Sequence, residues 1–237
     1  MKFFVGTSGF SYKEWKGRFY PEDLPDGEML SFYATRFGAV EINNSFYRMP
    51  ARPVLTRWAD ETPVDFTFVL KAPRRITHER RLGDVAEIVS YFFDTASALG
   101  DKRGPVLFQL PPYFHKDLAR LQDFLDMLPT GLKPTLEFRH LSWYDEKVNE
   151  ALRSRGAALC HRDSDDPKAP AASLSATADW GYLRLRRIDY QDDDLRRWAD
   201  VIGAQPWTEA YVFFKHEEGG HGPELAQRFR RLLSSGQ

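Results

Sequence analysis

The stretch TLEFRHLSW, residues 135–143, ends an apolar run with a carboxylate from Glu137 and a guanidinium from Arg139. Because successive side chains of a β-strand point to opposite faces, Glu137 and Arg139 share one face, and Leu136 and Phe138 share the other. A polar side chain between apolar neighbours lies more readily at an open strand end than inside a layer of helices. The stretch therefore predicts a strand with an apolar outer face and a charged carboxyl end.

Seven further β-rich runs occur along the chain, and most are followed by a loop and a segment with helical spacing, as at Leu118, Leu121, Leu125 and Leu128. The runs are FFVGTSG (3–9), AVEINNS (39–45), DFTFVLKAP (65–73), GPVLFQLP (104–111), AALCHRD (157–163), GYLRLR (181–186) and AYVFFKH (210–216). Alternating strands and helices imply a parallel sheet covered by helices. Since no glycine fingerprint of a dinucleotide-binding fold occurs, eight such units favour a closed (β/α)8 TIM-type barrel over a doubly wound sheet.

The length of 237 residues is close to the roughly 250 that are typical of one such barrel, so we expect a single domain over residues 1–237. The sixth unit is the weakest. The connection after its strand reads DSDDPKAPAASLSATAD, residues 163–179, and has more loop character than helical character. The sequence therefore leaves open a barrel that is irregular or incomplete around this unit.

The composition is that of a folded protein, with 42% hydrophobic and 28% charged residues. No stretch approaches the roughly 18 apolar residues of a membrane span, and the run FFV near the start is too short for a secretory signal. We therefore expect a cytoplasmic protein with no membrane partner. The single cysteine, Cys160, allows no internal disulfide and lies in the apolar run AALC, so we expect it to be buried.

The carboxyl ends of barrel strands converge on one mouth, so polar side chains at these ends are expected to lie together. The alternation seen in residues 135–143 places further polar side chains on the inner face of other strands. They are Glu41 and Asn43 on the second strand, Lys71 on the third, Gln109 on the fourth, and Arg184 with Arg186 on the seventh. The sixth strand contributes either His161 with Asp163 or Arg162, depending on its register.

The predicted mouth is richer in positive charge than the whole chain, whose formal net charge is −1. Its cations are Lys71, Arg139, Arg184, Arg186 and Lys215, and its acids are Glu41, Glu137 and Asp163. The run KAPRRITHERR, residues 71–81, adds Arg74, Arg75, Arg80 and Arg81, and its His78 either contacts an anion together with Arg75 or caps the loop. A concave basic site concentrates anions, so we expect a phosphate-containing small molecule or nucleic acid as the partner. In the alternative, the opposite charges pair into a structural ring.

Aromatic side chains follow several of the predicted strands, among them Trp15, Tyr47 and Trp143. Rings beside arginines can stack on bases or on sugar faces. The same rings could instead pack the loops onto the barrel rim. Taken together as ligand contacts, they predict a sizeable ligand rather than a small ion.

Six stretches, in this order, resemble the family called domain of unknown function 72, also described as YecE-like. They are GTSGFSYKEWKGRFYP (6–21), EINNSFYRMP (41–50), FVLKAPRRITHERRL (68–82), GPVLFQLPP (104–112), LEFRHLSW (136–143) and GHGPELA (220–226). The resemblance implies a TIM-type barrel and no securely assigned activity. Two strand ends depart from the family pattern. The seventh reads RLRR where the family has Arg-Leu-His-Gly, and the eighth reads FFKHEE where the family has asparagines.

The residues support two functional hypotheses. In the first, the protein is an enzyme, such as a phosphoester hydrolase or sugar-phosphate isomerase, with Glu137 or Glu41 as general acid or base and the arginines holding the anion. In the second, a non-catalytic module binds nucleic acid or another polyanion through residues 71–81, with an affinity that falls steeply with salt. The strand-end carboxylates favour the enzyme modestly, because a polyanion groove has little use for acids at its centre.

A divalent metal is a further alternative, with Glu137, His161, Asp163 and His216 as oxygen and imidazole ligands. No short spacing such as His-Glu-x-x-His occurs, and the interleaved arginines and lysines would repel a cation. We therefore assign no metal ligands and leave a divalent cofactor open.

Overall fold

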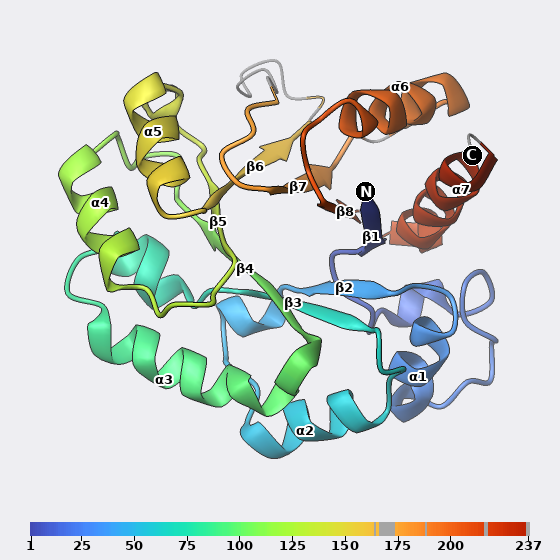
Figure 1. Ribbon diagram of the computed structural model, residues 1–237. Coiled ribbons are helices and arrows are strands. Elements are labelled where there is room, and N and C mark those ends of the chain that lie inside the picture. Colours follow the sequence, from blue (N-terminus) through green and yellow to red (C-terminus); the bar gives the residue numbers. More distant parts are fainter. Residues whose placement is uncertain (164, 166–173, 188, 216–217, 236–237) are drawn as a thin grey trace.

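The computed structural model describes residues 1–163, 165, 174–187, 189–215 and 218–235, and this part of the chain forms an eight-stranded sheet surrounded by helices (Figure 1). The strands are β1 (Lys2–Thr7), β2 (Ala39–Ile42), β3 (Thr67–Lys71), β4 (Arg103–Gln109), β5 (Pro134–Glu137), β6 (Ala158–Arg162), β7 (Trp180–Leu185) and β8 (Glu209–Phe214). The α-helices are α1 (Met29–Ala34), α2 (Arg52–Asp60), α3 (Ala86–Ala96), α4 (Leu118–Met127), α5 (Glu146–Ser154), α6 (Asp192–Gly203) and α7 (His221–Ser235). Short helical turns also occur between these elements, among them η2 (Asp26–Glu28), η3 (Asn44–Phe46) and η4 (Arg75–Glu79).

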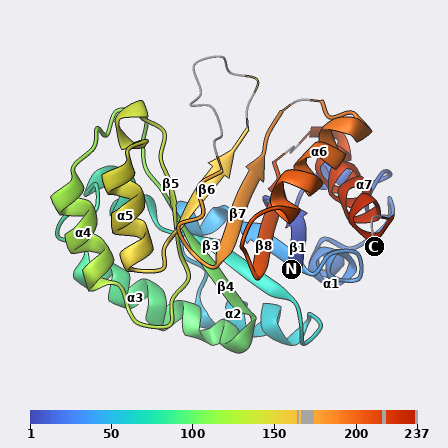
Figure 2. The same ribbon diagram turned by 45° about the horizontal axis from the view of Figure 1, so that its top comes forward.

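The paired strands are all parallel, and their order in the sheet is β1-β8-β7-β6-β5-β4-β3-β2. Each strand therefore lies beside its neighbour in sequence, and β8 returns to β1. Helices lie on the outside of the strands in both views, with α3, α4 and α5 on the side opposite α6 and α7 (Figures 1 and 2). The arrangement confirms the predicted TIM-type barrel, which is nearly closed.

The barrel closes between β1 and β2, where a single bridge pairs Ser8 with Glu41 and the Gly9 amide donates to the Glu41 carbonyl at 2.7 Å. On the amino-terminal side of this bridge, a side chain joins β1 to β2 in place of direct strand pairing. The Tyr33 hydroxyl accepts from the Thr7 amide at 2.8 Å and lies 3.1 Å from the Ala39 carbonyl oxygen, to which it donates.

Close approach at this junction also requires a glycine. A Cβ atom at Gly6 would lie 2.0 Å from the carbonyl oxygen of Ala39, well inside contact distance. The least regular pairing in the barrel is therefore between β1 and β2, and it is bridged by Tyr33.

Alternation along the strands divides the apolar side chains into two clusters. One fills the inside of the barrel and includes Val69, Leu107, Cys160 and Tyr182. The other lies between the sheet and the helices and includes Leu136, Phe138, Phe92, Leu121 and Phe229. Cys160 is 2% exposed, as expected for a buried free thiol.

The helices form for local reasons and then bury one face. Asp117 caps α4 by accepting from the Arg120 amide at 3.1 Å, and α6 begins with a capping box between Gln191 and Asp194. Helix α7 packs beside β1, so the two ends of the described chain lie near each other (Figure 1). No described helix is both long enough and apolar enough to cross a membrane.

The connection between β6 and β7 contains no helix in its described residues, 163, 165 and 174–179. Residues 164 and 166–173, which belong to the segment predicted to be irregular, lie outside the described part. Thr177 closes one end of this connection on β6, since its Oγ1 accepts from the Leu159 amide and donates to the Ala157 carbonyl, both at 2.8 Å.

Candidate functional site at the barrel mouth

Arg184, on β7, is the centre of a buried charge network at the carboxyl ends of the strands. Its side chain is 1% exposed and donates to Glu137 Oε2 at 2.6 Å and to Glu41 Oε1 at 2.9 Å. Both carboxylates are fully buried. Since the three residues come from β7, β5 and β2, the network joins strands that are far apart in sequence.

Glu41 is surrounded by donors. Its Oε1 also accepts from the Ser8 hydroxyl, and its Oε2 accepts from the Tyr182 hydroxyl, each at 2.5 Å. Burial and the nearby Glu41 charge raise the pKa of Tyr182, so this hydroxyl keeps its proton and remains a donor. The carboxylate is thus held by one cation and two neutral hydroxyl groups.

Glu137 lies between two arginines, because Arg139 Nε donates to its Oε1 at 3.0 Å while Arg184 occupies Oε2. Burial alone would raise the pKa of Glu137. The attraction of Arg184 and Arg139 outweighs it and holds the pKa well below its usual range. A carboxylate with so low a pKa carries no proton at neutral pH and is a weak base. Its catalytic role stays a prediction, while its contacts fix the two arginines in place.

Three further cations, Lys71, Arg162 and Arg186, have no carboxylate within ion-pair distance in the described part of the chain. Burial, together with repulsion from Arg184, lowers the pKa of Lys71 to about 8 and also lowers the pKa of Arg186. Arg162 Nε is buried and has no hydrogen-bond partner among the described residues. The mouth therefore has more positive charge than its own carboxylates neutralise.

Phe46 supports both Lys71 and His78. Lys71 Nζ lies 4.0 Å from the centroid of the Phe46 ring, and the His78 ring lies 4.9 Å from it, edge to face. Burial and repulsion from Lys71 lower the pKa of His78 to about 4, so the imidazole is neutral at neutral pH. His78 thus lies beside the cationic mouth as an uncharged ring, and its contact with an anion stays a prediction.

Gln109 and Asn43 complete the surroundings of Arg184. Their amide oxygens lie 3.3 and 3.5 Å from its terminal nitrogens, at the long end of hydrogen-bond range. The Asn43 Nδ2 is buried and has no partner in the described residues. Asn43 therefore has a donor to offer a bound molecule.

Asp163 has a different position from the one expected of a ligand contact. Its carboxylate accepts from the Tyr190 hydroxyl at 2.6 Å and from the Arg186 amide at 2.8 Å. Burial raises its pKa although these hydrogen bonds oppose the shift. Asp163 thus anchors the backbone from which Arg186 projects towards the mouth.

The loop after β3 carries its arginines outward. Arg74 and Arg75 are exposed, and Arg74 pairs with Glu79 at 3.3 Å. The residues that follow have an unusual backbone, with positive φ at Arg81 (48°), Leu82 (69°) and Asp84 (50°). Such conformations cost about 1–3 kcal/mol each for residues other than glycine, so the surrounding structure imposes the shape of this loop.

The three aromatic residues predicted to contact a ligand divide into two groups. Trp15 and Trp143 are each only 1% exposed and belong to the core. Trp143 stacks on Phe138 at 4.7 Å, and its indole nitrogen donates to a backbone carbonyl at 2.7 Å. Neither tryptophan reaches the mouth, because each packs a loop onto the barrel. Tyr47 is 76% exposed and is the one of the three that is open to solvent.

The residues considered as metal ligands do not converge. Glu137 faces the inside of the barrel, whereas His161 faces outward, with its ring 6.1 Å from the ring of Trp207. His216 lies outside the described residues. Within the described ranges, no group of three or more histidine, cysteine or acidic side chains is arranged to hold a metal ion.

Two residues of the network were not among those predicted to form the site. Tyr182 lies two positions before Arg184, so the alternation of the strand already placed it inside the barrel. Ser8 gave no such signal, because its contact with Glu41 depends on the closure between β1 and β2. Arg162 rather than His161 faces the mouth, which resolves the register that the sequence left open.

The fold and this site define a TIM-type barrel with a buried arginine and two carboxylates at the carboxyl ends of its strands. Residues 4–237 match the family described as Protein of unknown function DUF72, and the chain belongs to that family. The resemblance to this family that the sequence motifs indicated is therefore confirmed.

Relatives in the family are known from sequence and from crystal structures. The chain is 33% identical to the UPF0759 protein YecE of Escherichia coli K12 over 141 residues, which cover 57% of this chain and 52%, about half, of YecE. It is 22% identical to the UPF0759 protein YunF of Bacillus subtilis over 91% of this chain and 79% of YunF. The crystal structure of a DUF72 family protein from Thermotoga maritima superposes with a TM-score of 0.89 at 27% identity, covering 99% of this chain and 100% of that one.

Proposed function

We propose that the barrel mouth binds the anionic group of a phosphate-containing small molecule. The observation that carries this proposal is the set of three cations, Lys71, Arg162 and Arg186, that have no carboxylate partner in the described residues. Unpaired charges at half-buried or buried positions are costly unless an opposite charge compensates them. A bound anion would supply that compensation.

The carboxylates at the mouth do not oppose this proposal, because Arg184 and Arg139 already neutralise them. Arg184 donates to both Glu41 and Glu137, and Arg139 donates to Glu137. This pairing accounts for part of the structural ring of charges that the sequence left as an alternative. The cations Lys71, Arg162 and Arg186 remain outside this pairing. Guanidinium groups fixed at the ends of strands are suited to phosphate oxygens.

Binding is proposed without a reaction, because both mouth carboxylates are engaged. Glu137 is held between two arginines, and Glu41 is held by Arg184, Ser8 and Tyr182. A general acid or base must be free to take up or release a proton at the substrate. The strand-end carboxylates that favoured an enzyme in the sequence are therefore explained by pairing within the protein.

A polyanion such as nucleic acid would use the exposed loop after β3 instead. Arg74 and Arg75 are accessible there, but Arg74 is already paired with Glu79. The unpaired cations are at the strand ends rather than along this loop, which favours a compact anion over a long one. A polyanion would show an affinity that falls steeply with salt and that depends on Arg74 and Arg75.

The proposal is tested by titrating inorganic phosphate into the protein, followed by calorimetry and by ³¹P line widths. Arg186→Gln and Lys71→Met should each weaken phosphate binding about tenfold or more, since a hydrogen bond to a charged group contributes about 1.5–3 kcal/mol. Arg196→Gln, on the exposed face of α6, removes one positive charge away from the mouth and should leave the affinity unchanged. Absence of saturable binding, or equal binding by all three variants, would overturn the proposal.

A further inference from the structure

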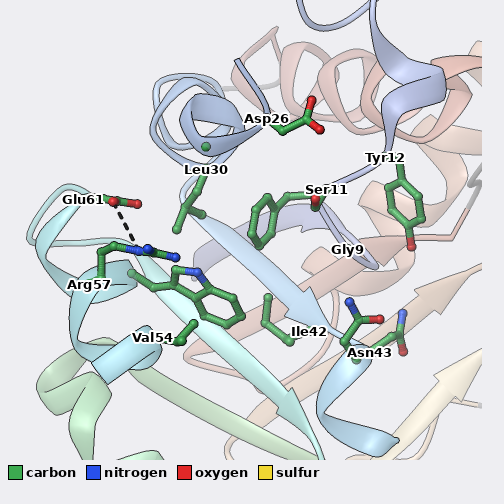
Figure 3. A pocket seen from close by; sticks show the side chains of 14 residues that line it. Gly9, Ser11, Tyr12, Asp26, Leu30, Ile42, Asn43, Val54, Arg57 and Glu61 are labelled. Carbon is green, nitrogen blue, oxygen red and sulfur yellow. Dashed lines mark ion pairs between the residues drawn. The ribbon is translucent and has the colours of Figure 1, made fainter. Parts of the chain in front are cut away.

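A cavity of about 380 Å³ lies beside the mouth, between the loop after β1, the start of α1 and the helix α2 (Figure 3). Its floor is apolar and includes Leu30, Ile42 and Val54, and two aromatic rings, Phe10 and Trp58, add to it. Hydroxyl, amide and charged groups surround this floor. The cavity thus combines an apolar base with a polar wall.

The charged groups of this wall are already paired. Arg57 and Glu61 form an ion pair at 3.6 Å, drawn in Figure 3, and Asp26 pairs with Lys16 at 3.0 Å and with Lys13 at 3.2 Å. The two lysines hold the pKa of Asp26 below its usual value, so it remains an acceptor at neutral pH. In contrast with the mouth, the cavity has no unpaired charge among its described lining residues, and it suits an uncharged group.

The cavity and the mouth share a wall. Asn43 lines the cavity, and its amide oxygen lies 3.5 Å from a terminal nitrogen of Arg184. The turn η3 that follows also lies between them, because Asn44 lines the cavity and Phe46 supports Lys71. Ser45 links this turn to β3 by donating to the Lys71 carbonyl at 2.7 Å. The cavity and the mouth are therefore adjacent regions of the structure.

We infer that this cavity is a subsite for the hydroxyl-bearing part of a sugar phosphate, whose phosphate lies at the mouth; the inference rests on the proposed function. Sugar hydroxyls both donate and accept. The wall offers acceptors on Asp26 and Glu61 and donors on Asn43 and Arg57. A sugar oxygen that reaches Asn43 would satisfy its buried Nδ2, which has no partner in the described residues.

The size and the floor of the cavity agree with this class. A volume of about 380 Å³ is near the lower end for small-molecule sites, which fits one sugar unit rather than an oligomer. The apolar face of a sugar ring packs on aromatic and aliphatic side chains such as those of Phe10 and Val54.

The inference is tested by calorimetry with inorganic phosphate, a panel of aldose and ketose phosphates of three to six carbons, the matching free sugars, and nucleoside monophosphates. At least one sugar phosphate should bind tenfold or more tightly than inorganic phosphate. Val54→Phe should remove this gain by filling the cavity and leave inorganic phosphate binding unchanged. Asn44→Ala should reduce the gain. Val64→Phe, at a position 90% exposed, is the matched control and should retain it.

The outcomes separate this inference from the proposed function. If inorganic phosphate binds but no sugar phosphate binds more tightly, the subsite is overturned and the anion site stands. A gain confined to nucleoside monophosphates, or a gain that survives Val54→Phe, also overturns the subsite. If inorganic phosphate itself fails to bind, the proposed anion site at the mouth is overturned. Arg186→Gln should weaken every phosphorylated member of the panel and thereby place their phosphates at the mouth.

Discussion

Arg184 determines the chemistry of the mouth at the scale of single residues. It is fully buried with two carboxylates, and Coulombic attraction to Glu41 and Glu137 raises its pKa although burial opposes this. The strand pattern predicted that these three residues face the same space, because alternation depends only on sequence. It could not predict which charges pair, since pairing depends on distances between strands that are far apart in sequence.

Removal of Arg184 should therefore be far more damaging than removal of an exposed arginine. Arg184→Met leaves two buried carboxylates without their shared partner, and loss of one partner of a buried pair costs about 3–5 kcal/mol. We expect a decrease of that size in the free energy of unfolding measured by urea denaturation.

The triple variant Arg184→Met, Glu41→Gln, Glu137→Gln removes the unpaired charges and should recover part of the loss. Arg196→Met, at an exposed ion pair on α6, should change the free energy by less than about 0.5 kcal/mol. A loss below about 1 kcal/mol in Arg184→Met would show that the network contributes little to stability.

At the scale of elements, the eight strands were predictable because each combines an apolar run with a polar end. The buried positions of Trp15 and Trp143 were not predictable, since aromatic residues after a strand can face either a ligand or the core, and only tertiary packing decides between them. The closure of the barrel was equally hidden. It depends on Gly6 and on the hydroxyl of Tyr33, a residue of α1 that bridges β1 and β2.

Tyr33→Phe tests this closure by removing one oxygen atom. The Thr7 amide and the Ala39 carbonyl would lose their buried partner, and an unsatisfied buried group costs about 1–3 kcal/mol. We expect the free energy of unfolding to fall by about that amount, and the Thr7 amide to exchange with solvent faster than in the unmodified protein.

Tyr91→Phe is the matched control, because Tyr91 is 66% exposed on α3 and its hydroxyl has no such role. Its free energy of unfolding should stay within about 0.5 kcal/mol of the original. Equal stability of the two variants would mean that water replaces the Tyr33 hydroxyl between β1 and β2.

At the scale of the whole molecule, a formal net charge of −1 conceals a positive mouth. The rest of the barrel must hold Lys71 and Arg186 against repulsion from Arg184 and Arg139, so folding and charge at the mouth are coupled. The composition did not indicate the positive mouth, because opposite charges on the outer helices cancel its charge in the net charge of the chain. It is visible only when strand order places the cations at one end of the barrel.

The stability of the whole molecule should accordingly rise as Lys71 loses its proton. Its pKa is about 8 in the folded protein against 10.5 as the ordinary value. Between these two pH values the unfolded chain binds more protons at this site than the folded one, and stability then increases with pH. The whole effect amounts to at most about 3 kcal/mol.

Comparison with Lys71→Met isolates this contribution from every other titrating group. The variant should be more stable than the original protein at pH 7, and the difference in their free energies of unfolding should shrink between pH 8 and 10.5. Lys147→Met, at an exposed position on α5, should differ from the original by a constant amount over the same range. If the difference for Lys71→Met is also constant, the charge on Lys71 is compensated in solution. Lys71 would then no longer count among the three unpaired cations of the mouth.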